Sequence, residues 1–152
     1  MRFTEQKLTM AEAASVAGYP DKLLQDALAK NTLQGCGVKD ARLGRWFFSP
    51  SDALGLTVAA LLAPQLKLSE RFHVAGIVAE HVETHIDESG ELNGPAEMTM
   101  VFGGVWPELL PEVSTPPEVD ELRQQYRPFV VVPVKMILKR VLARIAKLSQ
   151  EG

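Results

Sequence analysis

The chain has 152 residues, of which 46% are hydrophobic and 23% are charged, and its net charge at pH 7 is −3. A chain of this length can bury a sizeable core without a disulfide or a metal, and its composition excludes collagen-like, mucin-like and wholly disordered proteins. The single cysteine, Cys36, cannot form an intramolecular disulfide or a CxxC site, which favours a reducing compartment. No segment has the apolar run of a secretory signal or a membrane span, so we expect a cytoplasmic protein.

The charges are distributed unevenly along the chain. The net charge is +2 over residues 1–68, −11 over residues 69–121 and +6 over residues 122–152. Because salt screens charges over about 8 Å under physiological conditions, the local charge matters more to a partner than the total. The distribution indicates separate roles along the chain and does not exclude a nucleic-acid partner.

The first thirty residues predict two short helices joined by a tight turn. Thr9 and Glu12 have the spacing of a capping box that begins the first helix, and Gly18 has the backbone freedom that ends it. Pro20 suits the first turn of the second helix. The apolar face of that helix is predicted to comprise Leu23, Leu24, Ala27 and Leu28. The pattern is typical of a helix-turn-helix, and a plain helical hairpin fits it as well.

A basic hairpin and two further helices are predicted next. The segment GVKDARLGRWFFS, residues 37–49, predicts two strands with Gly44 at or beside the tip, and at least one aromatic ring of the second strand must turn inward. Ser49 and Asp52 have the spacing of a second capping box, which begins a helix over residues 50–62. The core face of this helix is predicted to comprise Leu54, Val58, Leu61 and Leu62. Another helix is predicted over residues 69–86.

This order of elements resembles the DNA-binding domain of the mercury-resistance regulator (MerR) type, a group that includes small excisionase-like proteins. The resemblance covers residues 8–80 and depends on the segments MAEAASVAG, RLGRWFFSPSDALGL and LKLSERFHVAGIVAE. It implies a winged helix-turn-helix whose second helix enters a major groove while the hairpin, or wing, contacts phosphates. Members of the family usually carry an arginine and an aromatic residue in the second helix, where this chain has Gln25 and Ala27.

The resemblance implies a set of DNA-contacting residues. They are Lys22, Gln25, Lys30, Lys39, Arg42, Arg45 and Trp46. The cations are expected to hold phosphates, and Gln25 is expected near base edges. Asp21 and Asp26 lower the affinity of one copy for a polyanion, so two copies in a dimer or the basic C-terminal segment must supply the rest. We expect a homodimer.

The resemblance leads us to expect a transcription regulator that binds double-stranded DNA. Two alternatives stay open at this point. One is an excisionase-like accessory protein that bends DNA, and the other is a protein-interaction or toxin-neutralising module that does not bind DNA.

The second half of the chain predicts a small sheet and a C-terminal helix. Residues 98–102 and 128–134 are predicted to form paired strands, and the prolines at both ends of the second segment indicate an edge strand or a short one. The intervening segment PELLPEVSTPPEVDE is predicted to be a proline-rich acidic loop. We therefore predict an α+β fold with two domains, a winged helix-turn-helix over residues 1–88 and a small α/β segment over residues 89–152.

The last helix, predicted over residues 134–148, is strongly amphipathic. Its apolar stripe is predicted to comprise Ile137, Leu138, Val141, Leu142, Ile145 and Leu148. Such a stripe must be buried, either against the rest of its own chain or in a homodimer. A membrane-surface role is the least favoured interpretation, because no aromatic residue lies within the stripe.

Few residues have the spacing of a chemical site. His81 and His85 lie one helical turn apart, which suits a divalent metal, but HVETH is not the HExxH pattern and we expect no metal site. The chain has no GxSxG elbow and no glycine-rich phosphate loop, and Cys36 has no evident base beside it. We expect neither an enzyme nor a cofactor.

Overall fold

A computed structural model describes residues 2–29, 36–62, 68–92, 99–103, 110–114 and 129–151. In these ranges the chain combines helices with small antiparallel sheets, as an α+β fold does. The elements are β1 (Leu8–Thr9), α1 (Met10–Ala17), α2 (Asp21–Ala29), β2 (Val38–Lys39), β3 (Trp46–Phe48), α3 (Pro50–Leu61), α4 (Leu68–His85), β4 (Thr99–Gly103), β5 (Leu110–Ser114), β6 (Phe129–Pro133) and α6 (Val134–Glu151).

Helices α1 and α3 begin at the predicted capping boxes. The Glu12 N–H donates to Thr9 Oγ1 over 3.2 Å, and the Thr9 N–H donates to the Glu12 carboxylate over 2.8 Å. Ser49 and Asp52 exchange the same pair of bonds at the start of α3, where Pro50 takes the first helical position. Both boxes satisfy N–H groups that have no partner within their helix, so the predicted starts of α1 and α3 are confirmed.

The hairpin belongs to a three-stranded antiparallel sheet of order β1-β3-β2. Leu8 of β1 pairs with Phe48 of β3, and Val38 of β2 pairs with Phe47 on the other side. Phe48 is fully buried, which confirms that one ring turns inward. Strand β1 was not predicted, because two residues before a capping box are too few to show the alternation of a strand.

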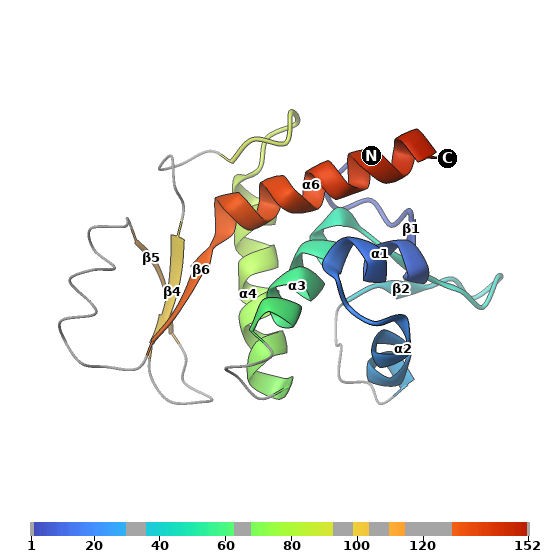
Figure 1. Ribbon diagram of the computed structural model, residues 1–152, viewed down its shortest axis with the longest axis horizontal. Coiled ribbons are helices and arrows are strands. Elements are labelled where there is room, and N and C mark those ends of the chain that lie inside the picture. Colours follow the sequence, from blue (N-terminus) through green and yellow to red (C-terminus); the bar gives the residue numbers. More distant parts are fainter. Residues whose placement is uncertain are drawn as a thin grey trace.

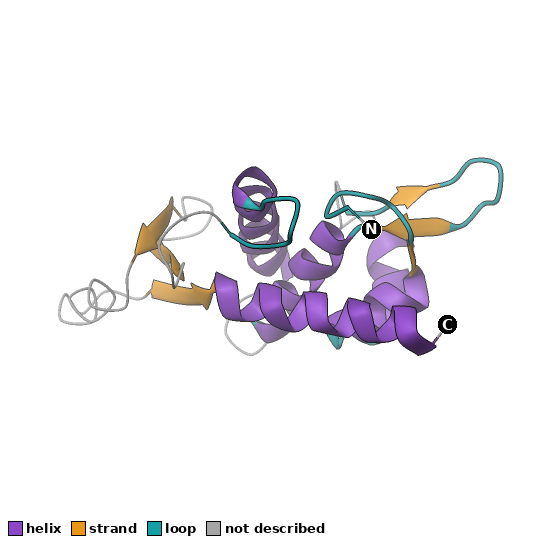
Figure 2. Cartoon of the chain, turned by 90° about the horizontal axis from the view of Figure 1, so that it is seen from above, coloured by secondary structure: helices purple, strands orange, loops and turns teal. Residues whose placement is uncertain are grey.

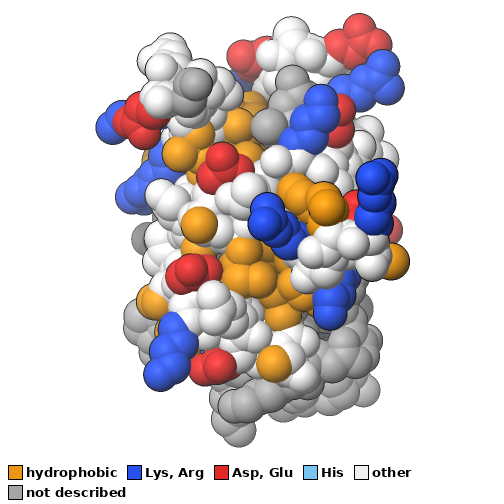
Figure 3. All heavy atoms as spheres, turned by 90° about the vertical axis from the view of Figure 1, so that its right-hand side faces the viewer, with side chains coloured by type: hydrophobic (Ala, Val, Ile, Leu, Met, Phe, Trp, Pro, Cys, Tyr) orange, Lys and Arg blue, Asp and Glu red, His pale blue; other side chains and the backbone are white. Residues whose placement is uncertain are grey.

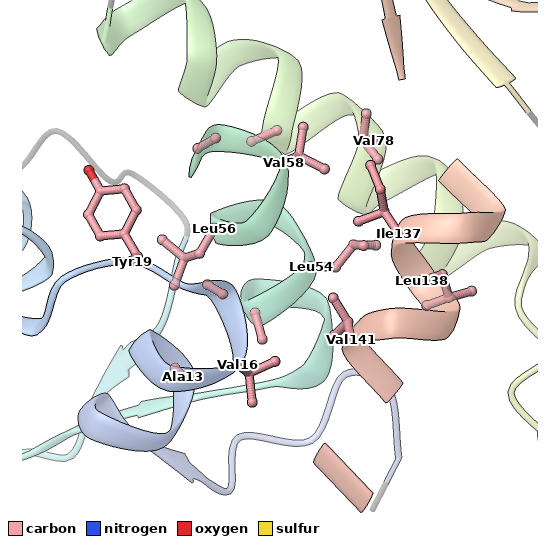
Figure 4. Packing of buried hydrophobic residues seen from close by; sticks show 14 of the residues in the cluster. Ala13, Val16, Tyr19, Leu54, Leu56, Val58, Val78, Ile137, Leu138 and Val141 are labelled. Atoms are coloured by element: carbon pink, nitrogen blue, oxygen red, sulfur yellow. The ribbon is translucent and has the colours of Figure 1, made fainter. Parts of the chain in front are cut away.

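Helix α3 lies at the centre of the core, between α1, α4 and α6 (Figures 1 and 4). Leu54 of α3 lies between Ile137 and Val141 of α6, and Val78 of α4 is close by (Figure 4). Side chains on several sides of α3 are buried, so this helix has no single solvent-facing side.

Two apolar side chains that the sequence assigns to core faces lie on the surface instead. Leu23 of α2 is 52% exposed, whereas Leu24 and Ala27 of the same helix are buried. Leu61, in the last turn of α3, is 49% exposed. Helical spacing alone predicted both positions as core, but Leu23 lies outside the narrow buried stripe of α2 and Leu61 is the last residue of α3.

The second sheet has the order β5-β4-β6. Strand β4 pairs with β6, as predicted; the structure shows that the pairing is antiparallel and that β6 forms an edge. Strand β5 corrects the prediction of a loop, because Leu110–Ser114 pairs with β4 along its whole length. Pro111 lies on the other edge of the sheet, where a missing N–H can face away from the ladder, so its presence does not exclude a strand. The rest of the predicted loop lies outside the described residues.

Helix α6 buries its apolar stripe against its own chain. Ile137, Leu138, Val141 and Ile145 are buried and belong to the same hydrophobic core as α1, α3 and α4. The sequence left open whether this stripe is buried within the chain or in a homodimer. The helix contacts α3 and α1, so the structure shows burial within the chain. The domain boundary between residues 88 and 89 stays a prediction. In the described part of the chain, no helix has the length and apolar character needed to cross a membrane.

Candidate nucleic-acid interface

The loop between β2 and β3, residues 40–45, is fixed by hydrogen bonds to a single aspartate. Asp40 Oδ1 accepts the N–H groups of Arg42 and Leu43, each over 2.8 Å. The Asp40 N–H donates to the Arg45 carbonyl, and the Gly44 N–H donates to the Asp40 carbonyl, again at 2.8 Å. Gly44 has a φ of 66°, a conformation that glycine adopts without steric cost. The side chains on this loop therefore extend from a backbone with defined geometry.

The cations of the hairpin point outward. Lys39, Arg42 and Arg45 are exposed, and none of them pairs with a carboxylate in the ranges that the structure describes. The one ion pair recorded for those ranges joins Lys7 to Glu5, away from this loop. The hairpin projects beyond the helices (Figures 1 and 2), so its guanidinium groups are accessible to a large anionic partner.

Trp46 is placed differently from the other predicted contact residues. It pairs with Lys39 at the base of the loop, is half-buried and packs against the hydrophobic core. Its position suggests that the ring supports the hairpin more than it contacts a partner.

Helix α2 presents a polar face of mixed charge. Lys22 and Gln25 are exposed, as predicted, and so are Asp21 and Asp26. Leu24 and Ala27 are buried and hold the helix on the core. Lys30, the remaining predicted contact, lies outside the described residues.

Charges of both signs are interspersed on the end of the molecule that carries the hairpin. Figure 3 shows Lys and Arg side chains scattered over this end, with Asp and Glu side chains and patches of hydrophobic surface between them. No broad basic surface is visible in this view. A polyanion would therefore be held by individual projecting cations, of which those on the hairpin are the most clearly presented.

Arg144 has a structural role that the sequence did not reveal. The Gly18 N–H donates to the Ala14 and Ser15 carbonyls, and the Arg144 guanidinium donates to the Val16 carbonyl over 2.7 Å. Carbonyls in the last turn of a helix have no partner within it, and a cation there also interacts favourably with the helix dipole. Arg144 thereby connects α6 to the end of α1, immediately before the turn into α2. The residue lies within an alternating apolar and basic pattern, so nothing in the sequence distinguishes it from its exposed neighbours.

Other candidate chemistry is weakly supported by the geometry. Burial, assisted by the negative charge of Asp52, raises the pKa of the Cys36 thiol well above its usual range, which disfavours the nucleophilic thiolate. The rings of His81 and His85 stack with centroids 4.2 Å apart, and His85 Nδ1 lies 2.8 Å from the His81 carbonyl oxygen. Burial and then the nearby His85 lower the pKa of His81. The described ranges contain no group of three metal-ligating side chains.

No protein-family model matches the chain, and a comparison with curated proteins gives no significant match.

Proposed function

We propose that this chain binds double-stranded DNA as a MerR-like or excisionase-like winged helix-turn-helix protein and regulates transcription. The observation that carries the proposal is the pair of exposed arginines, Arg42 and Arg45, which have no carboxylate partner in the described part of the chain and lie on a hydrogen-bonded loop that projects from the helices. Arginine is well suited to phosphate because its planar guanidinium donates several hydrogen bonds and keeps its charge at any physiological pH.

Helix α2 supplies the base-reading part of the proposal. It follows α1 through the tight turn at Gly18, and its exposed Lys22 and Gln25 can reach a groove while the hairpin holds the adjacent backbone. Glutamine can form paired hydrogen bonds with adenine in the major groove. Asp21 and Asp26 on the same helix repel phosphates, so the affinity of a single copy is low.

A homodimer on two half-sites would compensate for this weak binding. Because the apolar stripe of α6 is buried within the chain, such a dimer would have to use a different surface from the stripe of helix 134–148. The exposed side of α6 carries Lys139, Arg140 and Lys147, which do not favour direct contact between two copies of this helix.

The proposal is tested by measuring DNA binding as a function of salt. Duplexes selected by the full chain from a random pool are titrated by fluorescence anisotropy with the wild type and with the double variant Arg42→Ala/Arg45→Ala. If each arginine holds one phosphate, the slope of log affinity against log salt becomes shallower by about 2 in the double variant. The loss extends to all duplex sequences, because phosphate contacts carry no base information.

A double variant on α6 provides the matched control. Lys139→Ala/Arg140→Ala removes the same charge from exposed positions on another element. It should leave the salt slope closer to that of the wild type than the hairpin variant does. Equal slopes for the wild type and the hairpin variant, or equal losses in the two double variants, contradict the assignment of the hairpin as the phosphate-binding element.

A protein-interaction module is the second candidate function. The exposed Leu23 lies on α2 between the exposed Asp21 and Asp26, a combination that suits a basic protein partner with an apolar pocket. Retention of such a partner by the immobilised chain, together with no retardation of any duplex at low salt, would favour this candidate over DNA binding.

A further inference from the structure

The hairpin exposes apolar side chains as well as cations. Five large hydrophobic side chains in the described ranges are exposed, and three of them lie on α2 or the hairpin, namely Leu23, Val38 and Leu43. Single exposed leucines are common on protein surfaces and need no explanation by themselves. Leu43 differs because it lies in the loop of a projecting hairpin, 58% exposed, with Arg42 before it and Arg45 two residues after it.

The position of Leu43 is defined by the same bonds that fix the loop. Its own N–H donates to Asp40 Oδ1 over 2.8 Å, and the neighbouring Gly44 N–H donates to the Asp40 carbonyl. A side chain on a fixed backbone loses little conformational freedom when it is buried by a partner. Leu43 is therefore an exposed apolar group on a backbone that is already ordered before contact.

The dimensions of DNA decide which part of the hairpin can enter a groove. The minor groove is about 6 Å wide, and two paired strands are separated by nearly 5 Å before their side chains are counted. The loop is therefore the part of the hairpin that best fits this groove, and Leu43 is its exposed large apolar side chain, with the exposed Arg42 and Arg45 close to it in sequence. Leucine on a minor-groove element can insert between two base pairs and kink the duplex.

Building on the proposed function, we propose that Leu43 is a partially intercalating residue: the hairpin loop enters the minor groove and Leu43 separates one base-pair step. The free energy gained by burying a leucine is of the same order as the cost of unstacking a step. Binding is therefore expected where unstacking is easiest, at the flexible TA and CA/TG steps, and disfavoured on stiff A-tracts. The two arginines supply the attraction that holds the loop in place.

The test uses short duplexes selected from a random pool by the full chain. End-attached fluorophores report the bend by energy transfer, and 2-aminopurine placed at successive steps reports unstacking by an increase in fluorescence. The wild type is expected to bend the duplex and to brighten 2-aminopurine at one TA or CA/TG step per hairpin. Leu43→Ala should lose both signals while keeping the wild-type salt slope, and its affinity should change by less than about tenfold, because the lost apolar contact and the avoided cost of unstacking are of the same order.

Two further variants separate intercalation from a general effect of the substitution. Leu43→Met keeps a long apolar side chain and should retain the bend and the 2-aminopurine signal. Met136→Ala removes another exposed apolar side chain and should behave as the wild type. Met136 is 71% exposed and lies in the first turn of α6, at the opposite end of that helix from the hairpin (Figure 1). Circular dichroism of each variant verifies that the fold is unchanged.

The outcomes distinguish this inference from the proposed function. If the wild type binds DNA without bending it, or if Leu43→Ala bends it as the wild type does, intercalation by Leu43 is overturned and DNA binding stands. If the wild type retards no duplex at low salt, DNA binding itself is overturned, and the role of Leu43 with it.

Discussion

The β2–β3 hairpin and helix α6 both carry several cations, but they place their apolar side chains in opposite ways. Helix α6 buries Leu138 and Val141 in the common core, and its Arg144 donates to a backbone carbonyl of α1. The hairpin buries Phe48 at its base but leaves Leu43 exposed in its loop, and its arginines have no carboxylate partner among the described residues.

This difference shows that a cluster of cations in a sequence does not by itself identify a binding surface. The amphipathic pattern of α6 places one face in the core, where at least one of its cations serves the fold. The hairpin loop has few apolar side chains with which to pack, so its geometry depends on hydrogen bonds that the Arg42 and Leu43 N–H groups donate to Asp40. Substitutions of Arg144 and of the buried side chains of α6 should therefore reduce stability, whereas substitutions of exposed hairpin side chains should affect binding.

The largest expected effect is the loss of a core side chain from α6. Leu138 is 2% exposed and belongs to the hydrophobic core, so Leu138→Ala leaves a cavity and should lower the free energy of unfolding by about 3 to 4 kcal/mol. Leu43→Ala, the same substitution in the hairpin loop, should change it by less than about 0.5 kcal/mol. Urea denaturation of both variants measures the contrast, and similar losses would show that Leu43 is part of the core.

Alanine substitutions of two glycines in the hairpin region should destabilise the protein by different amounts. The two glycines have similar φ angles but different surroundings. Gly37 has a φ of 76°, and an added Cβ would lie 2.6 Å from Cε1 of the fully buried Phe48 ring. Gly37→Ala should therefore cost about 2 to 3 kcal/mol through backbone strain and overpacking. Gly44 has a φ of 66°, and no atom lies within 4 Å of a Cβ added there. Gly44→Ala should therefore lower the free energy of unfolding only through backbone strain, by about 1 kcal/mol. Equal losses of unfolding free energy in the two variants, measured by urea denaturation, would show that the Phe48 ring moves aside.

The sequence predicted local structure best where one short motif decides it. The capping boxes at Thr9 and Ser49 and the turn at Gly18 each depend on bonds within a few residues, and the structure confirms all three. The strand at Leu110–Ser114 was missed because its formation depends on pairing with β4, which the amino-acid sequence of the segment alone does not indicate. Proline-rich composition was given too much weight there, since an edge strand tolerates proline.

The candidate interface was predictable only where the local sequence decides the exposure of a side chain. Exposure of Arg42 and Arg45 follows from the position of a polar loop between two strands. The contact between Arg144 and the Val16 carbonyl joins residues that are 128 positions apart, so no local pattern could have indicated it. The exposure of Leu23 depends on how far α1 and the core extend over α2, which also requires the tertiary structure.

A smaller effect is expected for the bond between α6 and α1. Arg144→Ala leaves the Val16 carbonyl without the donor that now lies 2.7 Å away, and should lower the free energy of unfolding by about 1 to 2 kcal/mol. Arg140→Ala, one turn earlier on the exposed side of α6, removes the same side chain and should change it by less than about 0.5 kcal/mol. Amide hydrogen exchange should also quicken at Gly18 in the first variant alone. Indistinguishable denaturation midpoints would mean that the carbonyl finds an equally good partner in water.

The smallest effect on global stability is expected for Asp40, although it fixes the loop that carries Arg42 and Leu43. Its carboxylate bonds are exposed, so Asp40→Ala should cost no more than about 1 kcal/mol of unfolding free energy. The local consequence is larger, because the Arg42 and Leu43 amides lose their acceptor and should exchange with solvent much faster. Asp40→Asn keeps an oxygen that can accept these bonds and should preserve most of the protection. If the alanine variant protects both amides as the wild type does, the loop is held by the β2–β3 pairing alone, and the defined orientation of Leu43 does not depend on Asp40.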